Sequence, residues 1–309
     1  MPYFSAILVL NPDNATALNN LGIAYLRMDN CSYAEKLFDM ASRDPSVAPL
    51  ALQNKGMSLV CQGRVDTAEG IFTTLIDQNR SDSVSRYQRG IIYYEKGDLL
   101  KANDDLKEAA LQNPDDREIM RAYATTLAAL GKYDEGLSKL EYIINMSPHD
   151  DLAWFNKAVI LERKGEFKKA VDAYDSAIEI RPENHKAWFN KGIILWNHYM
   201  LNESLSALNT VISLEPNMSE AWFFRGLALK QLKNYDEASR SFQNASMLSP
   251  GNEIYSAYLK KYQGISLDDL DGDEKTFPFR YRIWQIILPM VVVSGSWIIG
   301  ILWTRKRFR

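Results

Sequence analysis

Residues 187–216 read AWFNKGIILWNHYMLNESLSALNTVISLEP, and residues 221–250 read AWFFRGLALKQLKNYDEASRSFQNASMLSP. The two stretches start 34 residues apart and share the spacing of a tryptophan, a glycine, a second small residue and a closing proline. Within each stretch the apolar residues recur at helical spacing in two separate runs. Each 34-residue unit is therefore predicted to form two helices joined by a turn.

The same unit repeats without insertion from Ala15 to Asn252, in rows that begin at residues 15, 49, 83, 117, 151, 185 and 219. The eighth position of every row is small: Gly22, Gly56, Gly90, Ala124, Ala158, Gly192 and Gly226. The twentieth position is small as well: Ala34, Ala68, Ala102, Gly136, Ala170, Ser204 and Ala238. Large apolar residues occupy the eleventh and twenty-fourth positions. Small residues at a helix crossing let two backbones approach, and large neighbours fill the space beside the contact.

Turn residues separate the predicted helices. A glycine such as Gly165 stands between the two helices of several rows, and most rows close with a proline such as Pro182. Proline cannot continue a helix, so it ends the second helix before the next hairpin begins. Acidic pairs such as Asp115–Asp116 and Asp150–Asp151 precede first helices, where a carboxylate suits the helix dipole.

These rows resemble tetratricopeptide repeats over about three quarters of the chain. They follow the consensus motifs of that family, W-x-x-L-G-x-x-Y, A-x-x-x-F and P. Trp154, Trp188 and Trp222 stand at the family's tryptophan position. The resemblance implies an all-α, right-handed superhelical solenoid of helical hairpins, in which the first helices line a concave surface. Seven such repeats are predicted over residues 15–252.

Further segments flank the predicted array. Residues 253–264 continue a first-helix pattern without a partner and are predicted to be a capping helix. Residues 1–14 resemble the tail of a second helix, which indicates either a truncated repeat or an N-terminal cap. Residues 265–282 are acidic and punctuated by glycine and proline, as is typical of a linker.

Residues 283–303, IWQIILPMVVVSGSWIIGILW, carry no charge and are long enough to cross a bilayer as one helix. A basic tail follows over residues 304–309. The predicted membrane-interface residues are Trp284, Trp303, Arg305, Lys306 and Arg307. Ser296 and Gly300 form a small-xxx-small pair that could bring two such helices together in a homo-oligomer.

The side of the membrane on which the array lies is open to two interpretations. The N-terminal MPYFSAILVL lacks the basic region and cleavage site of a leader, which favours a cytoplasmic array. Basic residues beyond the span favour instead a cytoplasmic tail and an extracytoplasmic array. Seven N-x-S/T triplets, where composition predicts roughly two, agree with the second interpretation. They begin at Asn14, Asn30, Asn79, Asn145, Asn202, Asn217 and Asn244. We expect a cytoplasmic array, with the extracytoplasmic one as the alternative.

Composition and motifs argue against other classes of protein. The net charge of -3 offers no basic field for phosphate contacts, so a nucleic-acid partner is not expected. His149, His185 and His198 show no paired-ligand spacing, and no nucleotide-binding or nucleophile motif is present. Cys31 and Cys61 are too few for a disulfide framework and are predicted to be small packed hydrophobes. We expect no catalysis, no cofactor and no metal.

The candidate binding site lies on the first-helix positions that line the groove in this family. An incomplete amide ladder occupies the sixth position, with Asn20, Asn54, Gln88, Asn156 and Asn190. Side-chain amides both donate and accept, so such a ladder can bind an extended peptide backbone. The fifth position becomes aromatic at Phe155, Phe189 and Phe223, and Trp196 lies nearby. This pattern predicts a more hydrophobic groove in the C-terminal half of the array.

The predicted function is a membrane-anchored scaffold that binds a protein or an extended peptide. The alternative is a structural or assembly subunit of a membrane or envelope complex.

Overall fold

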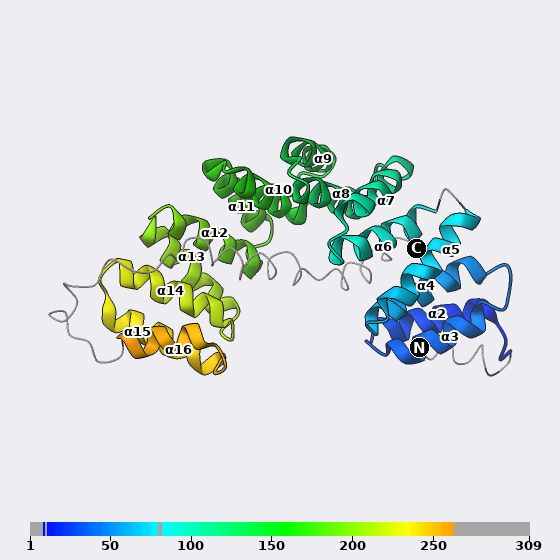
Figure 1. Ribbon diagram of the computed structural model, residues 1–309, viewed down its shortest axis with the longest axis horizontal. Coiled ribbons are helices and arrows are strands. Elements are labelled where there is room, and N and C mark those ends of the chain that lie inside the picture. Colours follow the sequence, from blue (N-terminus) through cyan, green and yellow to red (C-terminus); the bar gives the residue numbers. More distant parts are fainter. Residues whose placement is uncertain (1–8, 10, 80–81, 263–309) are drawn as a thin grey trace. The chain divides into compact units, whose positions relative to one another are not determined.

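The computed structural model describes residue 9, residues 11–79 and residues 82–262. Every regular element in these ranges is an α-helix (Figure 1), and the chain divides into two compact units. Unit 1 contains α2 (Ala15–Leu26), α3 (Cys31–Ala41), α4 (Ala48–Cys61), α5 (Val65–Gln78), α6 (Ser83–Glu95), α7 (Leu99–Gln112) and α8 (Arg117–Ala129). Unit 2 contains α9 (Tyr133–Met146), α10 (Asp151–Lys164), α11 (Phe167–Ile180), α12 (His185–Asn197), α13 (Leu201–Leu214), α14 (Ser219–Gln231), α15 (Tyr235–Leu248) and α16 (Glu253–Tyr262).

Each unit is a stack of helical hairpins. In unit 1 the hairpins are α2–α3, α4–α5 and α6–α7, and each second helix also packs on the first helix of the next hairpin. In unit 2 the hairpins α10–α11, α12–α13 and α14–α15 stack in the same way, with α16 packed on α15. Each hairpin contacts chiefly its neighbours, as expected of a solenoid. The predicted all-α hairpin solenoid is confirmed.

Short polar side chains start many of the first helices. The Asp116 carboxylate accepts hydrogen bonds from the backbone N–H groups of Glu118 and Ile119, and Asp150 accepts one from Ala153 at 2.9 Å. Asn184 and Asn14 cap α12 and α2 in the same way. These bonds satisfy backbone donors that have no partner inside the helix. The predicted capping role of Asp116 and Asp150 is confirmed.

The turn inside each hairpin needs one residue in the left-handed region. Glycine fills that place at Gly63, Gly97, Gly131 and Gly165, with φ between 74° and 84°. The equivalent residues of the other rows are Asp29, Tyr199 and Lys233, with φ of 58° to 61°. The seven residues are spaced 34 apart, so the turn keeps its geometry even where the sequence lacks glycine. A side chain in this region costs roughly 1–2 kcal/mol.

The two helices of a hairpin cross at the small eighth position. A Cβ atom added to Gly226 would lie 2.5 Å from the ring of Phe242, and one added to Gly56 would lie 2.5 Å from the ring of Phe72. Both rings are fully buried. The glycines therefore leave room for the large residue 16 positions further along the chain.

The tryptophan at the fourth position of each of the last three rows is tied to the proline that ends the preceding row. The indole Nε1 of Trp188 donates a hydrogen bond to the carbonyl oxygen of Pro182 at 2.9 Å. Trp154 and Trp222 make the same bond to the carbonyls of Pro148 and Pro216. Because proline's ring holds the backbone rigid and the indole has one donor, this pair fixes where the next hairpin begins.

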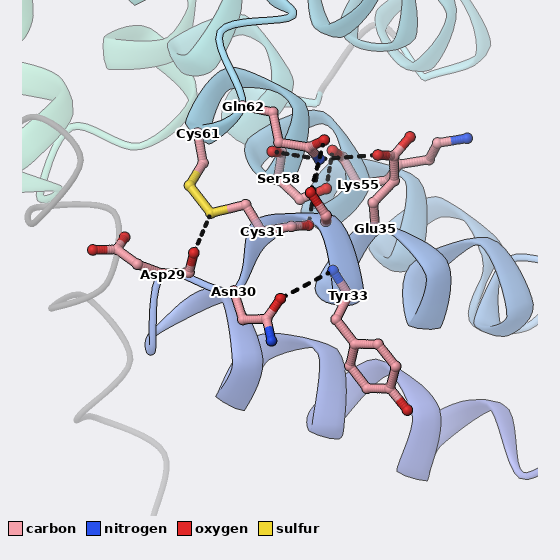
Figure 2. Close-up of a disulfide and its surroundings, with 10 residues drawn as sticks. Asp29, Asn30, Cys31, Tyr33, Glu35, Lys55, Ser58, Cys61 and Gln62 are labelled. Atoms are coloured by element: carbon pink, nitrogen blue, oxygen red, sulfur yellow. Dashed lines mark hydrogen bonds between the residues drawn. A yellow bond between two sulfur atoms is a disulfide. The ribbon is translucent and has the colours of Figure 1, made fainter.

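Cys31 and Cys61 form a disulfide, so the prediction that they are independent packed hydrophobes is wrong (Figure 2). Cys31 begins α3 and Cys61 ends α4, and their Cα atoms lie 6.1 Å apart, within the usual range for a bridge. The bond joins the second helix of one hairpin to the first helix of the next. Two cysteines cannot build a framework, but stacked hairpins can bring one such pair together.

Several predictions concern residues outside the described ranges. They include the N-terminal segment up to residue 8, most of the linker, the span 283–303, the basic tail and the Ser296/Gly300 pair. The interface residues Trp284, Trp303, Arg305, Lys306 and Arg307 also lie there. None of the helices within residues 9–262 combines the length and apolar character needed to cross a membrane.

Gly226→Ala should lower the free energy of unfolding by roughly 1–3 kcal/mol, because the new methyl group meets the enclosed ring of Phe242. Gly70 is the matched control, since it lies within α5 with no atom within 4 Å of an added Cβ. Gly70→Ala should stabilise by about 0.5–1 kcal/mol through helix propensity. Urea unfolding followed by circular dichroism measures both, and equal effects would contradict the assigned crossing.

Candidate protein-interaction surface

The first helices of successive hairpins contact one another directly within each unit. In unit 1, α2 contacts α4, α4 contacts α6 and α6 contacts α8, and in unit 2, α12 contacts α14. The first helices thus share a layer within each unit. The tetratricopeptide resemblance assigns the groove to the second, fifth, sixth, ninth, twelfth and thirteenth positions of the rows, which lie on the first helices. This layer is therefore the candidate binding surface.

Apolar side chains are exposed at the second position of three 34-residue rows, each within the first helix of its row. Leu50 in α4 is 39% exposed, Val84 in α6 is 43% exposed and Leu152 in α10 is 41% exposed. Two helical turns further along, on the same face, α4, α6 and α10 carry the half-buried Met57, Ile91 and Val159. We call these six residues the first-helix stripe, whose two parts are considered separately: Leu50, Met57, Val84 and Ile91 in unit 1, and Leu152 and Val159 in unit 2. Leu50, Val84 and Leu152 were missing from the predicted site, although their shared place in the 34-residue frame is visible in the sequence.

The predicted amide ladder lies mostly inside the fold. Asn54 is 3% exposed, and its Nδ2 donates to Oδ1 of Asn19 in the preceding first helix at 2.8 Å. Gln88 is buried too, whereas Asn20 and Asn156 are half-buried. The bond between Asn54 and Asn19 joins α2 to α4, so this amide stabilises the stack. Peptide binding by the ladder stays a prediction, and the half-buried Asn20 and Asn156 are the members best placed for it.

Asn190 belongs to a polar cluster with the buried Tyr174 and the half-buried Glu162. The Tyr174 hydroxyl donates to Oε2 of Glu162 at 2.9 Å. Burial raises the pKa of Tyr174 well above its ordinary value, and a hydrogen bond from Asn190 opposes that rise. Burial also raises the pKa of Glu162 to about 7, and the bond from Tyr174 opposes this rise. The cluster links α10, α11 and α12, and it keeps a carboxyl group that titrates near neutral pH beside the first helices.

The aromatic residues of the fifth position do not form one exposed row. Phe189 and Phe223 belong to the core, at 6% and 4% exposed, and Phe155 is half-buried. The ring of Phe224 in α14 covers Phe189 at 5.9 Å between centroids, and Tyr255 in α16 covers Phe223 at 4.7 Å. The next helix along the stack thus buries the ring before it.

Trp196 lies at the edge of this aromatic group. Its ring meets Phe224 edge-on at 5.6 Å, and the side chain is half-buried. Its Nε1 is enclosed and has no hydrogen-bond acceptor among the described residues. Of the four predicted aromatic site residues, Phe155 and Trp196 therefore keep the surface that a partner could contact.

Potential catalytic and metal-binding groups are scattered. His198 stacks on the ring of Phe167, with 3.8 Å between centroids, and His149 lies exposed in a turn. Among the described residues, one group of three could hold a metal ion: Asp29, Cys31 and Cys61. Both sulfur atoms of that group are used in the disulfide. The described residues thus offer a binding layer more readily than a reaction centre.

Comparison with known proteins identifies the repeats. Residues 87–151 and 124–185 match the tetratricopeptide repeat family, and residues 219–252 match a second description of the same repeat. Residues 87–185 and 219–252 therefore match tetratricopeptide repeats, and the described helices form a solenoid of hairpins of that type. The fold implies a scaffold for protein–protein interaction. No curated protein matches the sequence.

Solved structures share this architecture. A tetratricopeptide repeat protein from Parabacteroides merdae ATCC 43184 is 16% identical with a TM-score of 0.62, and the match covers 80% of this chain and 98% of that one. PilF of Pseudomonas aeruginosa is 11% identical with a TM-score of 0.58, over 70% of this chain and 98% of that one. The APC/C hetero-tetramer Cut9–Hcn1 is 16% identical with a TM-score of 0.61, over 84% and 51%. Such low identities show the fold alone.

Glu162→Gln should make stability less dependent on pH. A carboxyl group with a raised pKa holds its proton more tightly when folded, so stability falls as pH rises from 4.5 toward about 7 and stays lower above. At about pH 8 the variant should gain roughly 1–2 kcal/mol, less than the full pKa difference implies because the side chain is half-buried. Glu179→Gln on the exposed side of α11 is the control. Urea melts across this pH range that are parallel for Glu162→Gln and the wild type would contradict the assignment.

Proposed function

We propose that the protein is a membrane-anchored scaffold that binds a protein or an extended peptide on the first-helix layer of its repeats. The observation that carries the proposal is the first-helix stripe. In unit 1 two successive first helices expose an aliphatic side chain at the same register, Leu50 and Val84. In unit 2 Leu152 stands exposed at that register of its own row. Exposed apolar residues repeated on neighbouring helices are typical of a surface that contacts a partner.

Half-buried polar and aromatic groups flank the stripe. Gln53 stands three residues after Leu50, and its Nε2 donates to Asp82 at 2.8 Å. Phe155 stands three residues after Leu152 and packs edge-on against Tyr174. Side chains that are already held by such contacts lose little conformational freedom when a partner binds. The stripe thus combines apolar area with a largely preformed surround, which favours binding to an ordered or extended segment.

Membrane attachment is the second part of the proposal, and it is supported by sequence. Residues 283–303 are uncharged, long enough to span the hydrocarbon core, and bounded by arginines and tryptophans. The described array ends at Tyr262, so about twenty residues separate it from the span. A linker of that length leaves the first-helix layer free to meet a partner near the bilayer.

Changing Leu50, Val84 and Leu152 together to Ser should weaken partner capture at least about tenfold, because apolar anchors dominate interface energies. The fold should tolerate the change, since each side chain is already about two-fifths exposed. Pull-down of the full chain from matched membranes, read by quantitative mass spectrometry beside thermal melts, measures both effects.

The matched control is the triple change of Leu100, Leu111 and Met247 to Ser. These residues lie on the second helices α7 and α15 and are 66–71% exposed. The control should keep its partners. Equal loss in both variants would rule out the first-helix stripe, and recovery of only its own chain would favour the structural subunit.

Deleting residues 283–309 should move the protein from the membrane pellet to the soluble fraction while the helical signal per array residue is kept. The repeats pack among themselves within residues 15–262, so loss of the span removes none of their described contacts. Fractionation by ultracentrifugation with circular dichroism gives the result. A truncated protein that stays in the pellet, even after a carbonate wash, would refute the anchor.

A further inference from the structure

The disulfide lies at a hairpin junction whose counterparts in later repeats are held by ion pairs. Residues 30 apart bring the start of a second helix against the end of the next first helix, as Cys31 and Cys61 do. One residue further along in later repeats, Lys96 pairs with Asp66 and Lys164 pairs with Asp134, both at 2.6 Å. The same junction is thus held by reversible ion pairs in those repeats and by a covalent bond between the first two hairpins.

The immediate surroundings of the sulfur atoms suit a bridge (Figure 2). Cys31 is 5% exposed, and its Sγ lies 3.5 Å from the carbonyl oxygen of Asp29. Beside it, Gln62 Nε2 bonds to the Cys31 carbonyl and to Glu35, and Arg64 pairs with Glu35. These bonds already hold α3 against α4, so the sulfur atoms meet without a rearrangement of the hairpins.

A protein disulfide of this structural kind persists where the surroundings are oxidising, outside the cytosol. Its formation removes two protons and two electrons from the two thiols. A disulfide-bearing oxidoreductase accepts them by thiol–disulfide exchange and is itself reduced to a dithiol. The disulfide therefore indicates that the array folds in an oxidising compartment, outside the cytosol.

The glycosylation triplets supply an independent observation. All seven of their asparagines lie in second helices, in turns or at a helix start, and none lies within a first helix. Six other asparagines do lie within first helices, and none of these begins a triplet: Asn19, Asn20, Asn54, Asn156, Asn190 and Asn197. The acceptor asparagines thus lie outside the bodies of the first helices, with Asn14 capping α2 and Asn217 just before α14.

Five of the seven asparagines are exposed: Asn30, Asn79, Asn145, Asn202 and Asn217. Asn217 lies in the turn between α13 and α14, and Asn202 lies in the first turn of α13. Even Asn30, which caps α3, uses only its Oδ1 to accept from Tyr33. Sugar is attached at Nδ2, so the cap and the modification are compatible.

We propose that the repeat array lies on the extracytoplasmic side of the membrane, where Cys31 and Cys61 are bridged and Asn217 and Asn202 carry N-linked glycans. In the transfer, Nδ2 of Asn217 attacks the anomeric carbon of a sugar linked to a polyprenyl phosphate carrier. The carbon–oxygen bond to the carrier phosphate breaks, a carbon–nitrogen bond forms, and the amide loses one proton. This placement is the alternative to the cytoplasmic array expected from the N-terminal sequence.

The two observations agree for a physical reason. Disulfide formation and N-glycosylation both take place on exported chains, and each leaves a mark that cytosolic chemistry does not make. The inference does not depend on partner binding, because neither Cys31–Cys61 nor Asn217 belongs to the first-helix stripe. It adds to the scaffold a covalent clamp between two hairpins and glycans at exposed asparagines outside the bodies of the first helices.

The test uses the full chain from membranes of its source cells, denatured directly in a maleimide reagent and digested for mass spectrometry. We expect peptides containing Cys31 and Cys61 to be linked and unlabelled, and each to take one label after reduction. We expect Asn217 to be converted to Asp on enzymatic glycan release. Asn217→Gln should remove one glycan mass from the protein, whereas Asn11→Gln, at an exposed asparagine outside any triplet, should remove none.

Labelling of both cysteines before reduction would overturn the oxidising compartment. Labelling only after a chelator would show a metal site of Asp29, Cys31 and Cys61, and would overturn the disulfide. A linked cysteine pair with bare Asn217 and Asn202 would overturn the glycan assignment. Cys31→Ser combined with Cys61→Ser should leave glycan occupancy unchanged, which separates the effect of the compartment from that of the bridge.

Discussion

The close crossing of two helices at the eighth position of each row is the contact on which the rest of the structure depends. At Gly56 and Gly226 an added methyl group would meet an enclosed phenylalanine ring at 2.5 Å. The absence of a side chain there lets the ring of the second helix lie against the backbone of the first. Because the crossing recurs in the hairpins that have glycine at this position, those hairpins present similar surfaces to their neighbours. The stack, its junctions and its exposed stripe all follow from that regularity.

Regular stacking turns separations along the chain into contacts. Residues 30 apart meet at three hairpin junctions, as ion pairs in Lys96–Asp66 and Lys164–Asp134 and as a disulfide in Cys31–Cys61. The same regularity buries the fifth position wherever an aromatic residue of the following helix covers it, as Tyr255 covers Phe223. The residues that we propose for partner binding are accordingly ones that stacking leaves exposed, such as Leu50 and Val84 at the second position. Polar residues of the sixth position, such as Asn54, hold neighbouring first helices together.

Much of the fold was predictable, because helix periodicity and the small crossing residues are properties of nearby positions in the chain. The caps at Asp116 and Asp150 were predictable for the same reason. The candidate site was less so. Phe155, Phe189 and Phe223 occupy the same position of their rows in the sequence. The burial of Phe189 and Phe223 nevertheless depends on which side chain of the next first helix covers them. Asn54 likewise reads as a free amide until Asn19 is known to lie beside it.

The sequence by itself determined the class of the fold, because a 34-residue period of small, large and turn-forming residues admits one kind of hairpin. It also determined which residues begin glycosylation triplets and which segment is apolar enough for a membrane. Only the tertiary structure decided that Cys31 and Cys61 are joined, that Glu162 shares a polar cluster with Tyr174, and that Leu50 stays exposed. Each of these depends on how one hairpin is placed against the next. That placement is set by side-chain packing between residues far apart in the chain, which no local pattern contains.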